Sequence, residues 1–158
     1  MKRNWTKKKK KTRTERQRLE SKLWKITSIL VRRTSSTASG LNECFTCRVV
    51  KHWKQLDAGH CFTRKRAATK YDPNNLRPQC KQCNGFGKPG WARSSGAGER
   101  EEFKRRLAEE GVNVDALEIK SITGKTPTVE ELQDMIEDYT DLLDQMDRRQ
   151  QFESNHED

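Results

Sequence analysis

Two pairs of closely spaced cysteines constrain the fold of this chain more than any other feature. Cys44 and Cys47 form one Cys-x-x-Cys pair, and Cys80 and Cys83 form a second, with 32 residues between the pairs. Two intervening residues let both sulfurs of a tight turn reach one ion, and two such turns complete a tetrahedral sulfur site. Four thiolates leave no open position for chemistry, so the spacing predicts a closed, structural Zn²⁺. A disulfide pair and an iron–sulfur cluster are the alternative uses of these cysteines.

A structural metal would also explain how so polar a chain folds. Only 31% of the 158 residues are hydrophobic, against roughly 45–50% apolar residues in typical globular chains. This composition excludes a large enzyme with a deep apolar core, and by itself it places the chain near the disordered class. Metal binding supplies folding free energy on the order of 10 kcal/mol in zinc-finger peptides, which a small core cannot supply.

The sequence has no apolar segment of the kind that directs a chain into a membrane or out of the cell. Its longest apolar stretches are only a few residues, whereas a membrane span needs about 20. The basic N-terminus is followed by no apolar stretch, so it does not resemble a secretory signal. Five cysteines in such a chain indicate a reducing compartment. The fifth, Cys61, is either a small buried hydrophobe or a reactive thiol, and its strand-like surroundings favour the first.

Charge is distributed unevenly along the chain. The first 98 residues carry 25 basic and 5 acidic side chains, whereas the last 60 carry 8 basic and 18 acidic ones. The basic block indicates binding to a polyanion. A run of lysines cannot pack and predicts a disordered arm over residues 1–13, which contacts nucleic acid through counterion release or serves only as a solubilising tail. The lysines of this run are Lys7, Lys8, Lys9, Lys10 and Lys11.

Apolar periodicity predicts helices on both sides of the cysteine pairs. Residues 14–33 place an apolar side chain every three or four positions after the candidate N-cap Thr14, which is typical of a helix with one buried face. A polar linker follows over residues 34–40.

The acidic C-terminal region is also expected to be helical. One helix is predicted over residues 99–110, and a short one around residues 114–119. Thr128 and Glu131 form a capping box, and the helix that follows carries a heptad stripe of apolar residues over residues 129–149. This stripe either packs against the other helices of the chain or joins two copies of it.

Residues between and just after the cysteine pairs indicate chemistry. Asp57 and His60 are three residues apart, so they would face opposite sides of a regular strand. Gly59 permits a bulge, which would turn both side chains toward one pocket. Asn84 directly follows the last cysteine, and we expect it to open a helix, where it would also serve as a cap.

These residues resemble the HNH, or ββα-metal, nucleases, and more narrowly the NinG/Rap recombination endonucleases of lambda-like phages. Besides the cysteine pairs, the resemblance rests on Asp-Ala-Gly-His at residues 57–60, Asn-Asn-Leu-x-x-Gln-Cys at 74–80 and Cys-Asn at 83–84. Those proteins also carry a basic N-terminal helix and a C-terminal helix capped by Thr-x-x-Glu. The match covers about residues 20–148, with specific motifs over 44–88 and agreement in layout elsewhere.

The resemblance implies a small α+β fold in which a β-hairpin and a helix form a ββα-metal (HNH-like) core. A structural zinc would staple this core, which would also hold one catalytic divalent cation. The core would span residues 41–93, between the basic helix and linker of residues 14–40 and the acidic helical region of residues 94–158.

The resemblance also assigns catalytic roles. In such nucleases a hairpin histidine acts as general base on a water that attacks the scissile phosphate, and the matching residue is His60. A central asparagine orients the base, and Asn75 fits this position better than Asn74 because it immediately precedes Leu76.

The catalytic cation, Mg²⁺ or Mn²⁺, would stabilise charge on the phosphate and on the leaving oxygen. Asp57 and Asn84 match its ligands. Many family members place the metal-binding acid immediately before the histidine, where this chain has Gly59. Asp57 would therefore reach the cation from two residues earlier, or water would complete the metal shell.

Basic residues around this site are expected to bind flanking phosphates, with a solvated rim as the alternative. They are Arg64, Lys65, Arg66, Lys70, Arg77, Lys81 and Lys88.

The expected function is that of a metal-dependent DNA endonuclease that cleaves phosphodiester bonds in branched recombination intermediates, such as Holliday junctions or D-loops. We expect a homodimer in the cytoplasm of a host cell, with DNA as the partner and without a membrane or small-molecule substrate. The alternatives are a non-catalytic zinc-finger DNA-binding protein and an HNH nuclease of the nicking, homing, restriction or packaging type that cuts duplex DNA.

Overall fold

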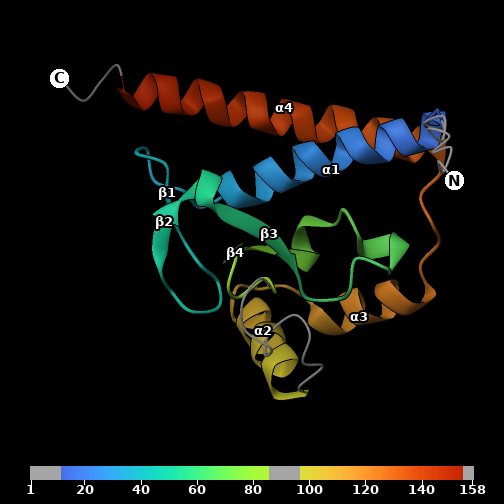
Figure 1. Cartoon of the computed structure of the whole chain (residues 1–158), viewed down its shortest axis with the longest axis horizontal. Coiled ribbons are helices and arrows are strands. Elements are labelled where there is room, and N and C mark those ends of the chain that lie inside the picture. The colour runs from blue at the N-terminus through green and yellow to red at the C-terminus, as the bar shows by residue number, and fades with distance from the viewer. Residues whose placement is uncertain (1–11, 86–96, 155–158) are drawn as a thin grey trace, which may run out of the picture.

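The computed structural model describes residues 12–85 and 97–154 of the chain (Figure 1). Within these two ranges the protein has four α-helices and two small antiparallel sheets. The chain therefore has a small α+β fold, as the sequence predicts.

The elements are arranged in three layers (Figure 1). Helices α1 (Glu15–Arg33) and α4 (Val129–Ser154) lie side by side in the upper layer. The strands occupy the middle, and α2 (Ala97–Glu109) and α3 (Val114–Thr123) lie below them. The basic region that contains α1 and the acidic region that contains α4 thus pack together in the upper layer.

Helix α1 begins where its sequence predicts. The hydroxyl of Thr14 accepts a hydrogen bond from the backbone N–H of Gln17 at 3.3 Å, and the Gln17 side chain accepts one from the backbone N–H of Thr14 at 3.1 Å. This reciprocal cap satisfies two of the N–H groups that the first turn leaves without partners. Leu23 and Leu30 are buried on the apolar face, so the predicted helix over residues 14–33 is confirmed.

Helix α4 has the predicted capping box at its start. The Glu131 carboxylate accepts the backbone N–H of Thr128 at 2.6 Å, and the Thr128 hydroxyl accepts that of Glu131 at 3.2 Å. The helix extends to Ser154, five residues beyond the predicted end at Arg149. Although α4 is long, it is highly charged, and no helix in the described ranges combines the length and apolar character that a membrane span requires.

Helices α1 and α4 run in the same direction. Near their starts, the Arg16 guanidinium donates to the carbonyl oxygen of Pro127, and near their ends the Arg33 guanidinium lies 2.6 Å from the Asp147 carboxylate. Between these contacts, Leu132 and Ile136 of the heptad stripe pack with Leu23, which places the first half of the stripe inside the chain's own core.

The strands form two separate hairpins. Strand β1 (Leu41–Glu43) pairs with β2 (Val50–His52), and β3 (Leu56–His60) pairs with β4 (Leu76–Cys80). The register of β3 and β4 is continuous from the pair Leu56–Cys80 to the pair His60–Leu76. The bulge predicted at Gly59 is therefore wrong, because β3 keeps the period-two alternation of a regular strand.

Gly59 has a different role, which is to let another side chain pass close by. A Cβ atom at this position would lie 1.7 Å from the side-chain oxygen of Gln79 on the paired strand. The Gln79 side chain is buried across Gly59 and donates a hydrogen bond to the Thr46 hydroxyl at 2.6 Å. The glycine thus allows β4 to be tied to the first cysteine turn.

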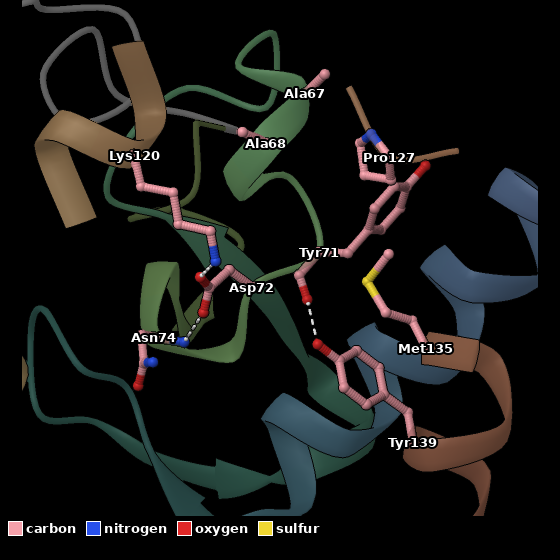
Figure 2. Close-up of a pocket in the computed structure, with 9 residues that line it drawn as sticks. All are labelled: Ala67, Ala68, Tyr71, Asp72, Asn74, Lys120, Pro127, Met135 and Tyr139. Atoms are coloured by element: carbon pink, nitrogen blue, oxygen red, sulfur yellow. Dashed lines mark hydrogen bonds and ion pairs between the residues drawn. The ribbon is translucent and has the colours of Figure 1, made fainter. Parts of the chain in front are cut away.

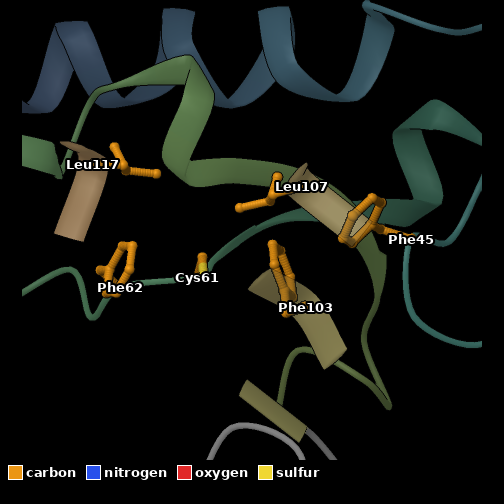
Figure 3. Packing of buried hydrophobic residues seen from close by; sticks show 6 residues of the cluster. All are labelled: Phe45, Cys61, Phe62, Phe103, Leu107 and Leu117. Atoms are coloured by element: carbon orange, nitrogen blue, oxygen red, sulfur yellow. The ribbon is translucent and has the colours of Figure 1, made fainter. Parts of the chain in front are cut away.

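The two faces of the β3–β4 hairpin are covered by different helices. On one face, Val31 and Trp24 of α1 pack against Ala58 and Leu76. The second core lies toward α2 and α3 (Figure 3) and contains Phe45, Cys61, Phe62, Phe103, Leu107 and Leu117. Cys61 is 7% exposed in this core, which confirms its expected place as a small buried side chain.

The helix predicted to open at Asn84 does not begin there. Residues 81–85 form consecutive turns, and the backbone N–H of Asn84 donates to the carbonyl oxygen of Cys80 at 2.9 Å, which closes the second cysteine turn. Within the described ranges, the next helix after β4 is α2, which begins at Ala97.

Candidate functional site

The four paired cysteines converge on one point. The sulfur atoms of Cys44, Cys47, Cys80 and Cys83 all lie within 4.8 Å of one another. In residues 12–85 and 97–154, no other group of three or more His, Cys, Asp or Glu side chains brings its ligand atoms together in this way. The cluster is positioned to bind a metal ion, and a set of four sulfurs is consistent with structural zinc.

Both cysteine pairs are held by the same kind of turn. The backbone N–H of Arg48 donates to the carbonyl oxygen of Cys44, and that of Asn84 to Cys80, each at 2.9 Å. Arg48 has φ of 63°, a left-handed conformation that reverses the chain after the first pair. The backbone N–H of Cys80 also donates to the Cys44 sulfur at 3.2 Å, which links the two turns.

The electrostatics of the cluster call for a cation. Burial raises the pKa of Cys44 and that of Cys83, and hydrogen bonds with the other thiols raise the pKa of Cys83 further. Burial acts in the same direction on Cys47, but hydrogen bonds from the Val49 backbone and from the other three thiols outweigh it and lower the pKa of Cys47. Four thiolates this close would repel one another, and a bound divalent cation offsets that repulsion and deprotonates its thiol ligands.

His60 lies at the end of β3 on the face toward α1. Its ring stacks on Trp24, with 5.3 Å between the ring centroids and 14° between the planes. Its Nε2 lies 3.0 Å from the carbonyl oxygen of Lys70. Because a carbonyl oxygen only accepts, Nε2 carries the proton, and Nδ1 is left as a hydrogen-bond acceptor.

The surroundings of His60 favour its neutral form. Burial lowers the pKa of His60, and the positive charges of Arg64 and Lys70 lower it further, against the opposing effect of the hydrogen bond to Lys70. A neutral imidazole with an acceptor nitrogen, placed beside two cations, has the chemistry of a general base next to an anion-binding site.

Trp24 is a part of this site that the sequence did not reveal. It lies on α1, far from the motif residues in sequence, and its indole contacts both the His60 ring and the Arg64 guanidinium, the latter 5.4 Å from the ring centroid. The one sequence feature that could have pointed to Trp24 is its position next to Leu23, at the edge of the apolar stripe of α1. Nothing in the local sequence indicates that this edge faces His60.

Asn75 fixes the loop that follows His60. Its side chain is fully buried. The Asn75 amide nitrogen donates to the carbonyl oxygens of Phe62 at 3.0 Å and Thr69 at 2.9 Å, and its oxygen accepts the backbone N–H of Phe62 at 2.7 Å. Asn75 therefore acts through the backbone of residues 62–69, whereas its neighbour Asn74 is exposed.

We expect the substitution Asn75→Ala to lower the free energy of unfolding by about 3–5 kcal/mol, because it removes three buried hydrogen bonds and takes the partner from both the N–H and the carbonyl oxygen of Phe62. Asn74→Ala is the matched control, and its effect should be within about 0.5 kcal/mol, as is usual at exposed positions. Urea unfolding followed by circular dichroism measures both values. Similar unfolding midpoints for the two variants would show that the Asn75 side chain does not hold this loop.

The two predicted ligands of a catalytic cation are not brought to His60. Asp57 and His60 lie on opposite faces of β3, because the strand is regular and they are three positions apart. Asp57 pairs with Gln79 near the cysteine end of the hairpin, whereas His60 pairs with Leu76 at the other end. Asn84 lies in the second cysteine turn. In this arrangement a cation bound by Asp57 would not lie beside His60.

The predicted DNA-binding residues fall into four groups. Arg77 is held within the protein, since its guanidinium lies 2.6 Å from the Glu110 carboxylate and also donates to the carbonyl oxygens of Pro73 and Leu76. Lys70 is partly covered, 4.0 Å from Glu20. The exposed members are Arg64, Lys65, Arg66 and Lys81. The members outside the described residues are Lys7, Lys8, Lys9, Lys10, Lys11 and Lys88.

A cleft of about 230 Å³ is lined by residues of the segment 67–74, by Lys120 of α3 and by Met135 and Tyr139 of α4 (Figure 2). Burial raises the pKa of Tyr139 to about 12, so its hydroxyl stays protonated and donates to the carbonyl oxygen of Tyr71 at 3.0 Å. Asp72 accepts from Lys120 at 2.6 Å and from the backbone N–H of Asn74 at 3.0 Å. The charged groups of the cleft, Asp72 and Lys120, form an ion pair with each other. Together with the hydrogen bond from Tyr139 to Tyr71, this pair joins the loop to α3 and α4.

Comparison with protein-family models, with curated proteins and with solved structures gives no match.

Proposed function

We propose that the chain is a DNA endonuclease whose general base is His60. The observation that carries the proposal is the setting of the imidazole. Its Nε2 is engaged by the Lys70 carbonyl oxygen, and no hydrogen bond reaches its Nδ1 from the part of the chain that the structure describes. Arg64 and Lys70 provide positive charge beside it, as a phosphodiester substrate requires.

In the proposed reaction, Nδ1 of His60 accepts a proton from a water molecule. The resulting hydroxide attacks the phosphorus atom, and the bond between phosphorus and the leaving oxygen breaks. Stacking on Trp24 and the hydrogen bond to Lys70 hold the ring in one orientation. A base that is already oriented loses less entropy when it reaches the reactive geometry.

We also propose that cleavage requires Mg²⁺ or Mn²⁺, as in the nucleases that the chain resembles. Such a cation supplies charge that stabilises the phosphate and the leaving oxygen. Asp57 and Asn84 remain the residues that the motif predicts as ligands of this cation. Because Asp57 faces away from His60, the arrangement described above does not fit a single cation shared between Asp57 and the water next to His60.

Branched DNA as the substrate, a homodimer and the cytoplasm of a phage's host cell follow from the resemblance to the NinG/Rap family. A resolvase that makes two symmetric nicks would need two copies of the site. Part of the heptad stripe is covered by α1, and the apolar side chains left exposed on α4 include Leu142 and Phe152. Light scattering on the purified chain would determine whether it is dimeric.

Cleavage of a four-way junction and of a linear duplex with the same sequence tests the proposed function. We expect Mg²⁺- or Mn²⁺-dependent cleavage, with the junction cut faster than the duplex. Equal rates would remove the preference for branched DNA and favour a nicking, homing, restriction or packaging type of HNH nuclease. DNA binding without cleavage in either metal would contradict the nuclease and favour a non-catalytic zinc-finger protein.

A further inference from the structure

The cations of this protein divide into those that are ion-paired and those that are not. Arg33, Arg48, Arg77 and Lys120 each lie 2.6 Å from a carboxylate. Lys104, Arg105 and Arg106 of α2 are paired with glutamates as well. Paired cations are neutralised within the fold. The unpaired ones therefore identify the surface on which the protein carries uncompensated positive charge.

One row of unpaired cations lies on α1. Arg18, Lys22 and Lys25 are exposed, and within the described ranges none of them has an ion-pair partner. Their spacing of four and three residues places them on one face of the helix. This face is opposite Leu23, which is fully buried in the core.

A second row of unpaired cations lies in the loop after His60. Arg64, Lys65 and Arg66 are all exposed, and in the part of the chain that the structure describes they too have no carboxylate partner. This loop is anchored to the rest of the fold, because the Asn75 side chain forms hydrogen bonds with its backbone at both ends, at Phe62 and at Thr69.

Trp24 of α1 contacts both the loop row and His60. The Arg64 guanidinium lies 5.4 Å from the centroid of the Trp24 ring, and the other partner of that ring is His60. Ser21 and Ser28 lie one turn before and after Trp24 on α1 and supply hydroxyl groups, which commonly contact phosphates. The surface thus runs from α1 across Trp24 to the loop, with the proposed base at its centre.

Helix α4 limits the direction from which an anion can approach. It lies beside α1 (Figure 1), and its Leu132 and Ile136 pack against Leu23. Glu137, Asp141 and Asp144 are exposed on α4 at helical spacing, and among the described residues they have no cationic partner. Their charge repels phosphate, so an approaching polyanion is directed to the side of α1 that carries Trp24.

We propose that Arg18, Lys22 and Lys25 of α1, together with Arg64, Lys65 and Arg66, form one phosphate-binding surface that holds a DNA duplex across Trp24. This inference deepens the proposed function, because it names the surface that presents the substrate to His60. It adds α1 to the DNA-binding residues expected from sequence. The binding itself does not depend on cleavage and is measured separately.

The test uses the full chain and a fluorescein-labelled 30-base-pair duplex, with affinity measured by anisotropy over a series of NaCl concentrations. The first variant is Arg18→Ala/Lys22→Ala/Lys25→Ala, and the second is Arg64→Ala/Lys65→Ala/Arg66→Ala. Alanine has the highest helix propensity, so α1 should be retained in the first variant. The control Lys125→Ala/Arg148→Ala/Arg149→Ala removes the same charge from exposed positions elsewhere.

Each lost phosphate contact lowers the slope of log K against log salt by about 0.9, so each of the first two variants should lower it by about 2 to 3. The control should change the slope by less than about 1. Equal slopes for the α1 variant, the control and the wild type would overturn the inference. Equal losses in all three variants would also overturn it, since they would reflect net charge alone.

The same samples distinguish failure of this inference from failure of the proposed function. Cleavage by the wild type with unchanged binding by the α1 variant would leave the nuclease in place and remove this surface. Salt-dependent binding through both rows, without cleavage by the wild type, would keep the surface and remove the nuclease.

Discussion

The substitution Cys44→Ser is expected to abolish metal binding and to lower the melting temperature by about 20–40 °C. Cys44 is fully buried, contacts the other three cysteines and accepts the backbone N–H of Cys80 through its sulfur. A metal site contributes on the order of 10 kcal/mol in zinc-finger peptides, and each kcal/mol shifts the melting temperature of a chain this size by about 2–4 °C. Mass spectrometry of bound metals and thermal unfolding measure the two effects.

Cys61→Ala is the matched control for this prediction. Cys61 lies in the core formed with α2 and α3 and is not part of the metal-binding cluster. Its replacement should keep one zinc per chain and cost about 1–2 kcal/mol of packing. If Cys44→Ser retained one zinc per chain and the wild-type melting temperature, the four-sulfur site would not be a structural metal site.

His60→Ala should reduce the cleavage rate by about 10²–10⁴-fold, the usual contribution of a general base. His52→Ala is the control, because His52 lies in the other hairpin, where its ring accepts the backbone N–H of Lys54. Its cleavage rate should stay near that of the wild type. Cleavage by His60→Ala at the wild-type rate would exclude His60 as the base.

The pH dependence of cleavage should reflect the surroundings of His60. The base acts in its neutral form, and the folded protein lowers the pKa of His60, chiefly through burial. As pH falls, activity should therefore persist below the ordinary histidine value of about 6.5 and decline only as pH passes through the lower pKa of the folded state. NMR titration of the ring measures this pKa directly, even if no cleavage is found. A value above 6.5 would contradict the neutral base.

Local signals in the sequence were sufficient for much of this fold. The capping pairs Thr14–Gln17 and Thr128–Glu131 act within one turn of helix, so the starts of α1 and α4 depend on few other residues. The cysteine spacing likewise determines each turn locally. The position directly before Leu76 favoured Asn75 over Asn74, and Asn75 is the buried one of the two.

Long-range packing decided the features that the sequence could not predict. Gly59 suggested a bulge, but the strand is regular because Gln79, twenty residues later, passes over it. The heptad stripe of α4 did not reveal its partner, and the structure pairs its first half with α1. The contact between Trp24 and His60 depends on how α1 is seated on the hairpin, which no local pattern encodes.

The two hairpins share no strand pairing. The first turn after β1 and the end of β4 are instead joined by the cysteine cluster and by the hydrogen bond from Gln79 to Thr46. Arg106 of α2 donates to the carbonyl oxygens of Phe45 and Thr46 within that first turn, which ties a helix to the same junction. A ligand that binds only the native state raises the ratio of native to unfolded chains by a factor of one plus its free concentration divided by its dissociation constant. The fraction of chains in which both hairpins and α2 hold their native arrangement should therefore rise with the concentration of the metal ion that the four sulfurs bind.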